Sequence, residues 1–177
     1  MNRRLPTGLN SIRPGVLGAL GWSLCLGLLV LTAGCGGEGG AADPTIAHDQ
    51  TTPEGAIICL EDAYRANDIE AAIACKHFPT EARLMLESIN PDFASDEEIV
   101  ATTAEVLEAG FRAEVEENGF PDFSGVISSF GPREPYKGRD DVVQIKETCR
   151  AHGAEVSDIV KVANVDGKWY VVIVPER

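Results

Sequence analysis

Glu147 is the titratable side chain whose neighbours in the sequence best suit acid–base chemistry. It alternates with Val143, Ile145 and Cys149, and alternate residues of a strand share one face of a sheet. A carboxyl group buried on that apolar face has a raised pKa and can serve as a general acid or base. More often, such a residue lies at the edge or at the frayed end of its strand, where the carboxylate is solvated. The sequence leaves both interpretations open.

Nucleophilic and metal chemistry find little support in the pattern of residues. Cys149 is followed by His152, but side chains three apart on a strand point to opposite faces, so the two do not form a nucleophile–base pair. No Gly-x-Ser-x-Gly motif is present. His48, His77 and His152 share no ligand spacing, so we expect neither a metal site nor a cofactor, and no catalytic residue is assigned.

Cys59 and Cys75 are placed symmetrically about a predicted helix–helix turn. Each lies eight residues from Asn67, among alanines that allow two antiparallel helices to approach closely. A disulfide is geometrically reasonable if the two Cα atoms come within about 7 Å. The alternative is a pair of buried thiols, since cysteine is often simply a core residue. Under the first interpretation, Cys149 is the thiol left over.

Helices that would position these residues are indicated over the first half of the chain. Thr52-Pro53-Glu54 is a helix start with a hydroxyl N-cap, proline at the first helical position and an acid in the first turn. Asn67-Asp68 interrupts this helix, and Asp68 can cap a second one. The helices are predicted at about 53–66, 69–75, 80–89 and 96–118, the last with Ser95 as N-cap and Gly119 as its end.

Strands are indicated beyond Pro121, where the apolar period becomes alternating. They are predicted at 125–130, 142–151, 154–165 and 168–174. Asp166-Gly167 is a strong signal for a two-residue type I′ hairpin. Helices followed by an antiparallel meander predict an α+β domain with helices packed on one face of a curved sheet. In it, Trp169 and Tyr170 either pack at the core and rim or line a ligand pocket.

The first 35 residues have the layout of an export signal. Basic residues are followed by an apolar stretch at 16–31, which is short for a membrane span of about 20 residues. The ending Leu31-Thr32-Ala33-Gly34-Cys35 resembles the lipobox of bacterial lipoproteins. That resemblance implies cleavage after residue 34 and attachment of acyl chains, palmitate among them, to Cys35. The alternatives are an ordinary signal peptide cleaved nearby, or an uncleaved anchor.

The lipobox resemblance also implies where the protein resides. Gly36, in place of aspartate, is similar to enterobacterial lipoproteins of the outer membrane, so we expect a lipid anchor in the cell envelope, facing the periplasm. Residues 35–51 are small and polar and predict a lipidated flexible tether, and residues 52–177 form one domain. Loss of Arg3, Arg4 and Arg13 leaves 12 of the 15 basic residues against 28 acidic ones, a formal charge of −16. Such a charge disfavours nucleic acid as a partner.

Two segments resemble NTF2-like (SnoaL-like) domains. The first is Glu61 to Ala74, a helix end, an Asn-Asp turn and an alanine-rich helix; the second is Val165 to Val171, with the sequence Val-Asp-Gly-Lys-Trp-Tyr-Val. The resemblance implies a cone-shaped fold with a pocket between sheet and helices, which Tyr64, Glu147 and Trp169 would line. In the ketosteroid-isomerase-like branch, a catalytic tyrosine lies about two turns before the turn aspartate. Leu60 occupies that place here, and Tyr64 is one turn too close.

The expected function follows from these missing positions. We expect a non-enzymatic module that binds a small apolar ligand in its cone or a partner protein, with a homodimer as one such partner. The alternative is an NTF2-like isomerase or hydratase that acts on a small apolar ligand with Glu147 and either Tyr64 or Tyr170. The fold alone does not decide between them, because NTF2-like domains include both enzymes and binding modules.

Overall fold

The computed structural model of this chain describes residues 46–174, so the predicted export signal and Cys35 lie outside the described residues. No helix within that range is both long and apolar enough to span a membrane. The helices are α1 (Pro53–Ala66), α2 (Ile69–Ala74), α3 (Phe78–Ile89), α4 (Pro91–Ala94) and α5 (Glu97–Asn118). They precede all four strands, which confirms the α+β class and the helix-then-sheet order.

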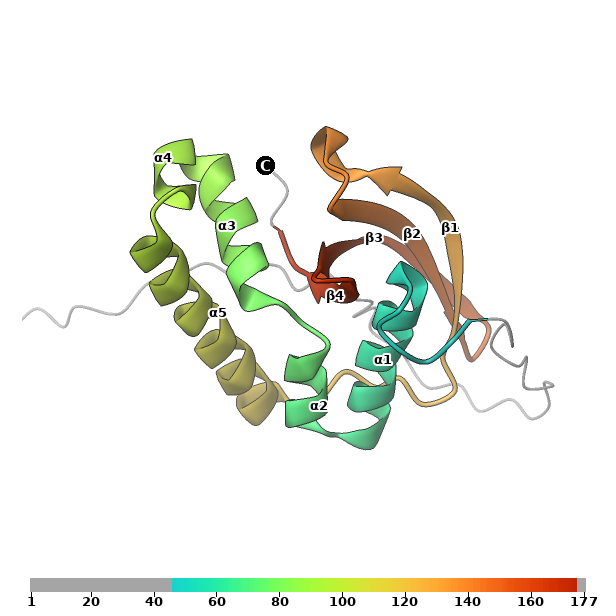
Figure 1. The fold of residues 1–177 in the computed structure, drawn as a ribbon. Coiled ribbons are helices and arrows are strands. Elements are labelled where there is room, and N and C mark those ends of the chain that lie inside the picture. Colours follow the sequence, from blue (N-terminus) through green and yellow to red (C-terminus); the bar gives the residue numbers. More distant parts are fainter. Residues whose placement is uncertain (1–45, 175–177) are drawn as a thin grey trace, which may run out of the picture.

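The strands form one open antiparallel sheet in the order β1-β2-β3-β4. Their bounds are β1 (Ile127–Pro135), β2 (Val142–Ala151), β3 (Ala154–Val165) and β4 (Lys168–Val172), with a short 3-10 turn, η1 (Tyr136–Gly138), between the first two. Figure 1 shows β1, β2 and β3 curving around α1, while α3 and α5 pack side by side beyond β4. This arrangement is compatible with a cone.

Local capping explains why the first two helices begin and end where predicted. The Thr52 side chain accepts a hydrogen bond from Gly55 N, and Pro53 is the first residue of α1. Asn67 adopts a left-handed conformation with φ of 53°, which ends the helix. The Asp68 side chain then accepts from Ala71 N and caps α2. The predicted turn between the two helices is confirmed.

Several boundaries differ from the prediction: α3 begins at Phe78 instead of Thr80, and the short helix α4 was not predicted. The N-cap of α5 is Asp96 and not Ser95, because the Asp96 carboxylate accepts from the backbone N–H groups of Glu98 and Ile99. Strand β1 continues to Pro135 instead of ending at Phe130. A shift of register between Phe130 and Arg133 accommodates the intervening glycine and proline, which an edge strand tolerates.

Both predicted turns between the last three strands have the left-handed backbone of a type I′ hairpin. Asp166 and Gly167 have φ of 51° and 83°, and His152 and Gly153 have φ of 51° and 81°. Mirror-image turns of this kind match the right-handed twist of the flanking strands. The His152-Gly153 turn fixes the pairing of β2 with β3, in which Glu147 lies opposite Asp158, and the Asp166-Gly167 turn fixes that of β3 with β4.

The core lies between α1 and the concave face of the sheet. Ile57, Leu60 and Tyr64 of α1 pack there with Ile145 of β2 and Val162 of β3, all at most 3% exposed. Residues 46–51, expected as the end of the tether, contact this domain. Gln50 O accepts from Trp169 N at 2.9 Å, and the Gln50 side chain donates to Ala74 O and Trp169 O.

Candidate functional site

Two buried carboxyl groups meet at the centre of the concave face. Glu147 of β2 is 3% exposed and Glu61 of α1 is 2% exposed. Ser128 of β1 donates from its hydroxyl to Glu61 Oε1 at 2.5 Å, and its Oγ lies 3.5 Å from Cys149 Sγ. We call Glu61, Ser128, Glu147 and Cys149 the carboxyl cluster. Of the two positions proposed from sequence for Glu147, the structure therefore has the buried one.

The environment of Glu147 favours its protonated form. Burial raises its pKa to about 8, and hydrogen bonding and charge repulsion from Glu61 add to the effect. The Ser128 hydroxyl and the Cys149 thiol oppose it. Among residues 46–174, Glu147 Oε1 nevertheless has no hydrogen-bond partner, which is unusual for a buried oxygen.

Glu61 is paired with a positively charged side chain. Arg65, one helical turn further along α1, donates from Nη2 to Glu61 Oε2 at 2.6 Å and from Nη1 to Asp62 at 2.6 Å. Its Nε also donates to the carbonyl of Phe123. The cluster thus holds two carboxyl groups beside a single guanidinium group.

Tyr64 and Trp169, the other two predicted pocket residues, lie elsewhere in the core and rim. Tyr64 is 2% exposed and packs against the rings of Phe120 and Phe123, with centroid distances of 5.9 and 5.7 Å. No described residue forms a hydrogen bond with the Tyr64 hydroxyl, and burial raises the pKa of Tyr64. Trp169 is half-buried on β4, where its backbone binds Gln50.

A second buried ion pair lies at the junction of α2 and α3. Lys76 Nζ is 3.1 Å from Glu81 Oε2, and their side chains are 1% and 7% exposed. The same carboxylate oxygen accepts from Ile173 N at 3.0 Å. The Lys76 ammonium group also lies over the rings of Phe78 and Phe111. Burial lowers the pKa of Lys76, and the Glu81 carboxylate opposes that effect.

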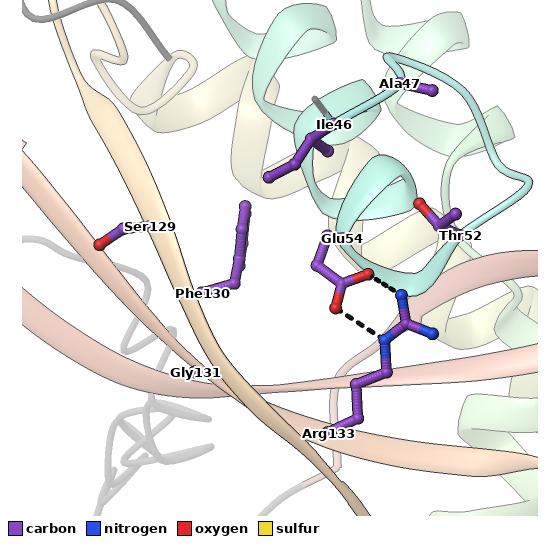
Figure 2. A pocket seen from close by; sticks show the side chains of 8 residues that line it. All are labelled: Ile46, Ala47, Thr52, Glu54, Ser129, Phe130, Gly131 and Arg133. Carbon is purple, nitrogen blue, oxygen red and sulfur yellow. Dashed lines mark hydrogen bonds and ion pairs between the residues drawn. The ribbon is translucent and has the colours of Figure 1, made fainter. Parts of the chain in front are cut away.

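A surface groove of about 410 Å³ separates the N-terminal segment from the edge strand β1. We call it the β1 groove; its lining residues are Ile46, Ala47, Thr52, Glu54, Ser129, Phe130, Gly131 and Arg133. Figure 2 shows Ile46 and Phe130 facing one another across it. Arg133 donates to both oxygens of Glu54, from Nε at 2.7 Å and from Nη2 at 2.5 Å.

Gly55 allows the N-terminal segment to form the wall of this groove. A Cβ at this position would come within 2.6 Å of Ala47 O and would also contact Asp49 O. No side chain larger than hydrogen therefore fits without moving the segment. A second hollow, lined by Asp96, Ile99 and Thr103 among others, lies at the start of α5. Neither hollow is lined by Glu61, Tyr64, Glu147 or Trp169.

The cysteines and histidines fall into separate environments. Cys59 and Cys75 are thiols within hydrogen-bonding reach of one another, so the predicted proximity is observed, while the disulfide itself stays a prediction. His77 caps α3 by accepting from Thr80 N, and His48 lies 2.7 Å from Asp62. His152 lies in the turn between β2 and β3.

Sequence reasoning missed Glu61, Ser128 and Arg133. Glu61 could have been found, because it follows Ile57 by four residues and precedes Tyr64 by three, and so lies on the apolar stripe of α1. Ser128 alternates with Val126 and Phe130, which places a hydroxyl on an apolar face. Arg133 had no such signal, since its partner Glu54 is 79 residues away.

Comparison with known proteins adds no family assignment: no protein-family model, curated protein or solved structure matches this chain.

Proposed function

We propose that this protein is a lipid-anchored, non-enzymatic binding module of the cell envelope, and that its ligand site is the β1 groove. The proposal rests on which candidate site a ligand can reach from solvent. The β1 groove is open to the surface, whereas the acid–base groups of the carboxyl cluster are at most 7% exposed and line neither hollow. A substrate would have to displace core side chains to reach them.

The lining of the groove indicates a small amphiphilic ligand. Ile46, Ala47 and Phe130 supply apolar surface, and Thr52 and the Glu54–Arg133 pair supply polar groups at one end. Its volume of about 410 Å³ lies within the range of about 300–1,000 Å³ that is usual for small-molecule sites. Such sites bury apolar atoms and use a few polar groups to orient the ligand.

The proposed anchor places this groove close to a membrane. Cys35, the proposed lipidation site, precedes Ile46 by 11 residues. An extended chain spans at most ~3.6 Å per residue, so the groove stays within about 40 Å of the bilayer surface. Acyl chains on Cys35 supply the attachment, with about 0.8 kcal/mol for each buried methylene group. An outer-membrane location facing the periplasm is proposed on the Gly36 resemblance alone.

Native mass spectrometry of purified residues 36–177, before and after reduction, tests the binding proposal. We expect an adduct of a few hundred daltons that is lost in Arg133→Ala and retained in Arg150→Ala. Arg150 is a matched control, because it pairs with Glu155 at 2.6 Å on the exposed sheet surface. An adduct that survives Arg133→Ala would refute the groove as its site. The same spectra report whether the chain is a homodimer.

An enzyme is the second candidate, favoured by one observation: Glu147 has a pKa of about 8 and an oxygen without a hydrogen bond. An NTF2-like isomerase or hydratase would use such an acid. The NTF2-like fold itself is part of this proposal, supported by the helix–turn–helix opening, the curved sheet and the final hairpin. Turnover of a small apolar ketone or enone that is lost in Glu147→Gln would favour the enzyme, and turnover unaffected by that change would exclude Glu147 as its acid.

A further inference from the structure

The carboxyl cluster brings together the kinds of side chain that bind transition metals. One ligand atom from each of Glu61, Glu147 and Cys149 lies within 4.8 Å of the other two. They come from different elements, α1 and β2, and β1 adds the hydroxyl of Ser128. Two carboxylates with a thiolate suit zinc better than calcium or magnesium, which prefer oxygen ligands alone.

An independent observation points to a missing ligand at this place. Glu147 Oε1 is buried and has no hydrogen-bond partner in the described part of the chain, although the same side chain interacts with Glu61, Ser128 and Cys149. An unsatisfied buried oxygen of this kind destabilises the folded state, and more so when its group is charged. A cation within the cluster would coordinate the Glu147 carboxylate and remove that destabilisation.

We propose that Glu61, Glu147 and Cys149 form a buried site for one zinc-type divalent cation, with the Ser128 hydroxyl at the fourth position. Charge favours a cation at this place. Two carboxylates and one thiolate carry three negative charges, and the Arg65 guanidinium group, which Glu61 shares with Asp62, offsets only part of them. Binding releases the protons of the Cys149 thiol and of Glu147 to solvent, together with the water molecules that the aqueous cation carried.

The ligand atoms have to move only a short distance to bind a zinc ion. Zinc lies about 2.0–2.2 Å from carboxylate oxygen and about 2.3 Å from sulfur, so tetrahedral ligand atoms are roughly 3.3–3.7 Å apart. Ligand atoms now within 4.8 Å have to approach by about 1 Å. The Ser128 hydroxyl, which donates to Glu61 at 2.5 Å, has to turn its lone pair towards the ion. Arg65 keeps Glu61 oriented through Nη2, as outer-shell partners commonly do.

The site is separate from the β1 groove, so it goes beyond the proposed function and does not depend on it. The two are neighbours all the same, because Phe130 of the groove pairs with Glu147 across β1 and β2. A cation at Glu147 would therefore hold the strand that forms one wall of the groove.

Cobalt titration of the full chain, purified in detergent, stripped with a chelator and kept reduced, tests this proposal. We expect one Co²⁺ per chain with a near-ultraviolet thiolate-to-cobalt band, displaced by Zn²⁺. The band is expected to vanish in Cys149→Ser and to persist in Cys59→Ser, a matched cysteine outside the cluster. In Glu147→Gln the affinity should fall by more than ~100-fold, beyond the usual effect of an outer-shell change.

A measurement on the unaltered chain keeps the test independent of variants that fold poorly. Zn²⁺ should raise the midpoint temperature of thermal unfolding of the wild-type chain. The nearly isosteric Glu147→Gln variant should show no such increase with Zn²⁺. The proposal is overturned if wild-type protein shows neither a thiolate band nor a zinc-dependent midpoint, or if the band survives Cys149→Ser. In that case, a proton shared between Glu61 and Glu147 would explain why two carboxyl groups are buried together.

Discussion

The Lys76–Glu81 pair provides a sharp test of the energetics of this core. Its two side chains are 1% and 7% exposed, and Nζ lies 3.1 Å from Oε2. Glu81→Gln keeps the shape and can still accept from Ile173 N, but it leaves the buried ammonium group without an anion. Removing one partner of a buried pair typically costs about 3–5 kcal/mol, because the remaining charge is uncompensated.

The double variant separates the charge from the packing. Lys76→Met fills the space between Phe78 and Phe111 with an apolar chain of similar length, so Lys76→Met with Glu81→Gln should cost only about 1–2 kcal/mol. The coupling between the two changes should therefore be several kcal/mol. Glu155→Gln, which breaks the exposed Arg150–Glu155 pair, is the control and should cost at most ~1 kcal/mol.

Urea unfolding at several pH values measures these differences. In Glu81→Gln, the pKa of Lys76 in the folded state falls further below its ordinary 10.5, since the carboxylate no longer opposes burial. The unfolded state then binds the proton more tightly, so the deficit should shrink as the pH rises towards 10.5. A Glu81→Gln variant within 1 kcal/mol of wild type at pH 7, with an unchanged slope on urea, would refute the reasoning.

Three further predictions concern single sites. Cys35→Ser should abolish palmitate labelling, with Cys59→Ser as control, because the proposed acceptor thiol is gone; labelling that persists in Cys35→Ser would contradict the anchor. Oxidation should link Cys59 to Cys75, lowering the intact mass by two hydrogens and stabilising the domain by roughly 3 kcal/mol for a loop of this length; a peptide map with both thiols alkylated after oxidation would exclude it. In chelator, the unfolding free energy should fall as the pH rises from 4.5 to about 8, because the folded state holds the Glu147 proton more tightly than the unfolded state. Glu147→Gln should lose this dependence, and an identical pH profile for the variant would exclude Glu147 as its source.

Local signals in the sequence predicted most of the elements. Thr52, Asp68 and Asp166-Gly167 work through contacts with residues two or three positions away, so their effect can be read from a short segment. The second half of strand β1 was not predicted, because Gly131 and Pro132 indicate a loop. Only the pairing with β2, which absorbs them in a register shift, makes this segment a strand.

The candidate sites depend on contacts that no local pattern encodes. Ser128 meets Glu61 across 67 residues, and Arg133 meets Glu54 across 79. The burial of Glu147 was one of two interpretations from the sequence, since an alternating strand does not show where along its length the covering helix lies. Position along β2 is set by α1, whose Glu61 lies over that part of the strand.

If the proposed lipid anchor at Cys35 holds the chain, the hydrogen bonds of Gln50 determine how a pulling force enters the domain. Tension applied at Ile46 reaches Gln50 before it reaches the start of α1. There the load divides between the backbone of Trp169 on β4 and the carbonyl of Ala74 at the end of α2, through three hydrogen bonds of 2.9–3.2 Å. A pull from the membrane would therefore be shared by the sheet and the helices, instead of unwinding α1 from its first turn.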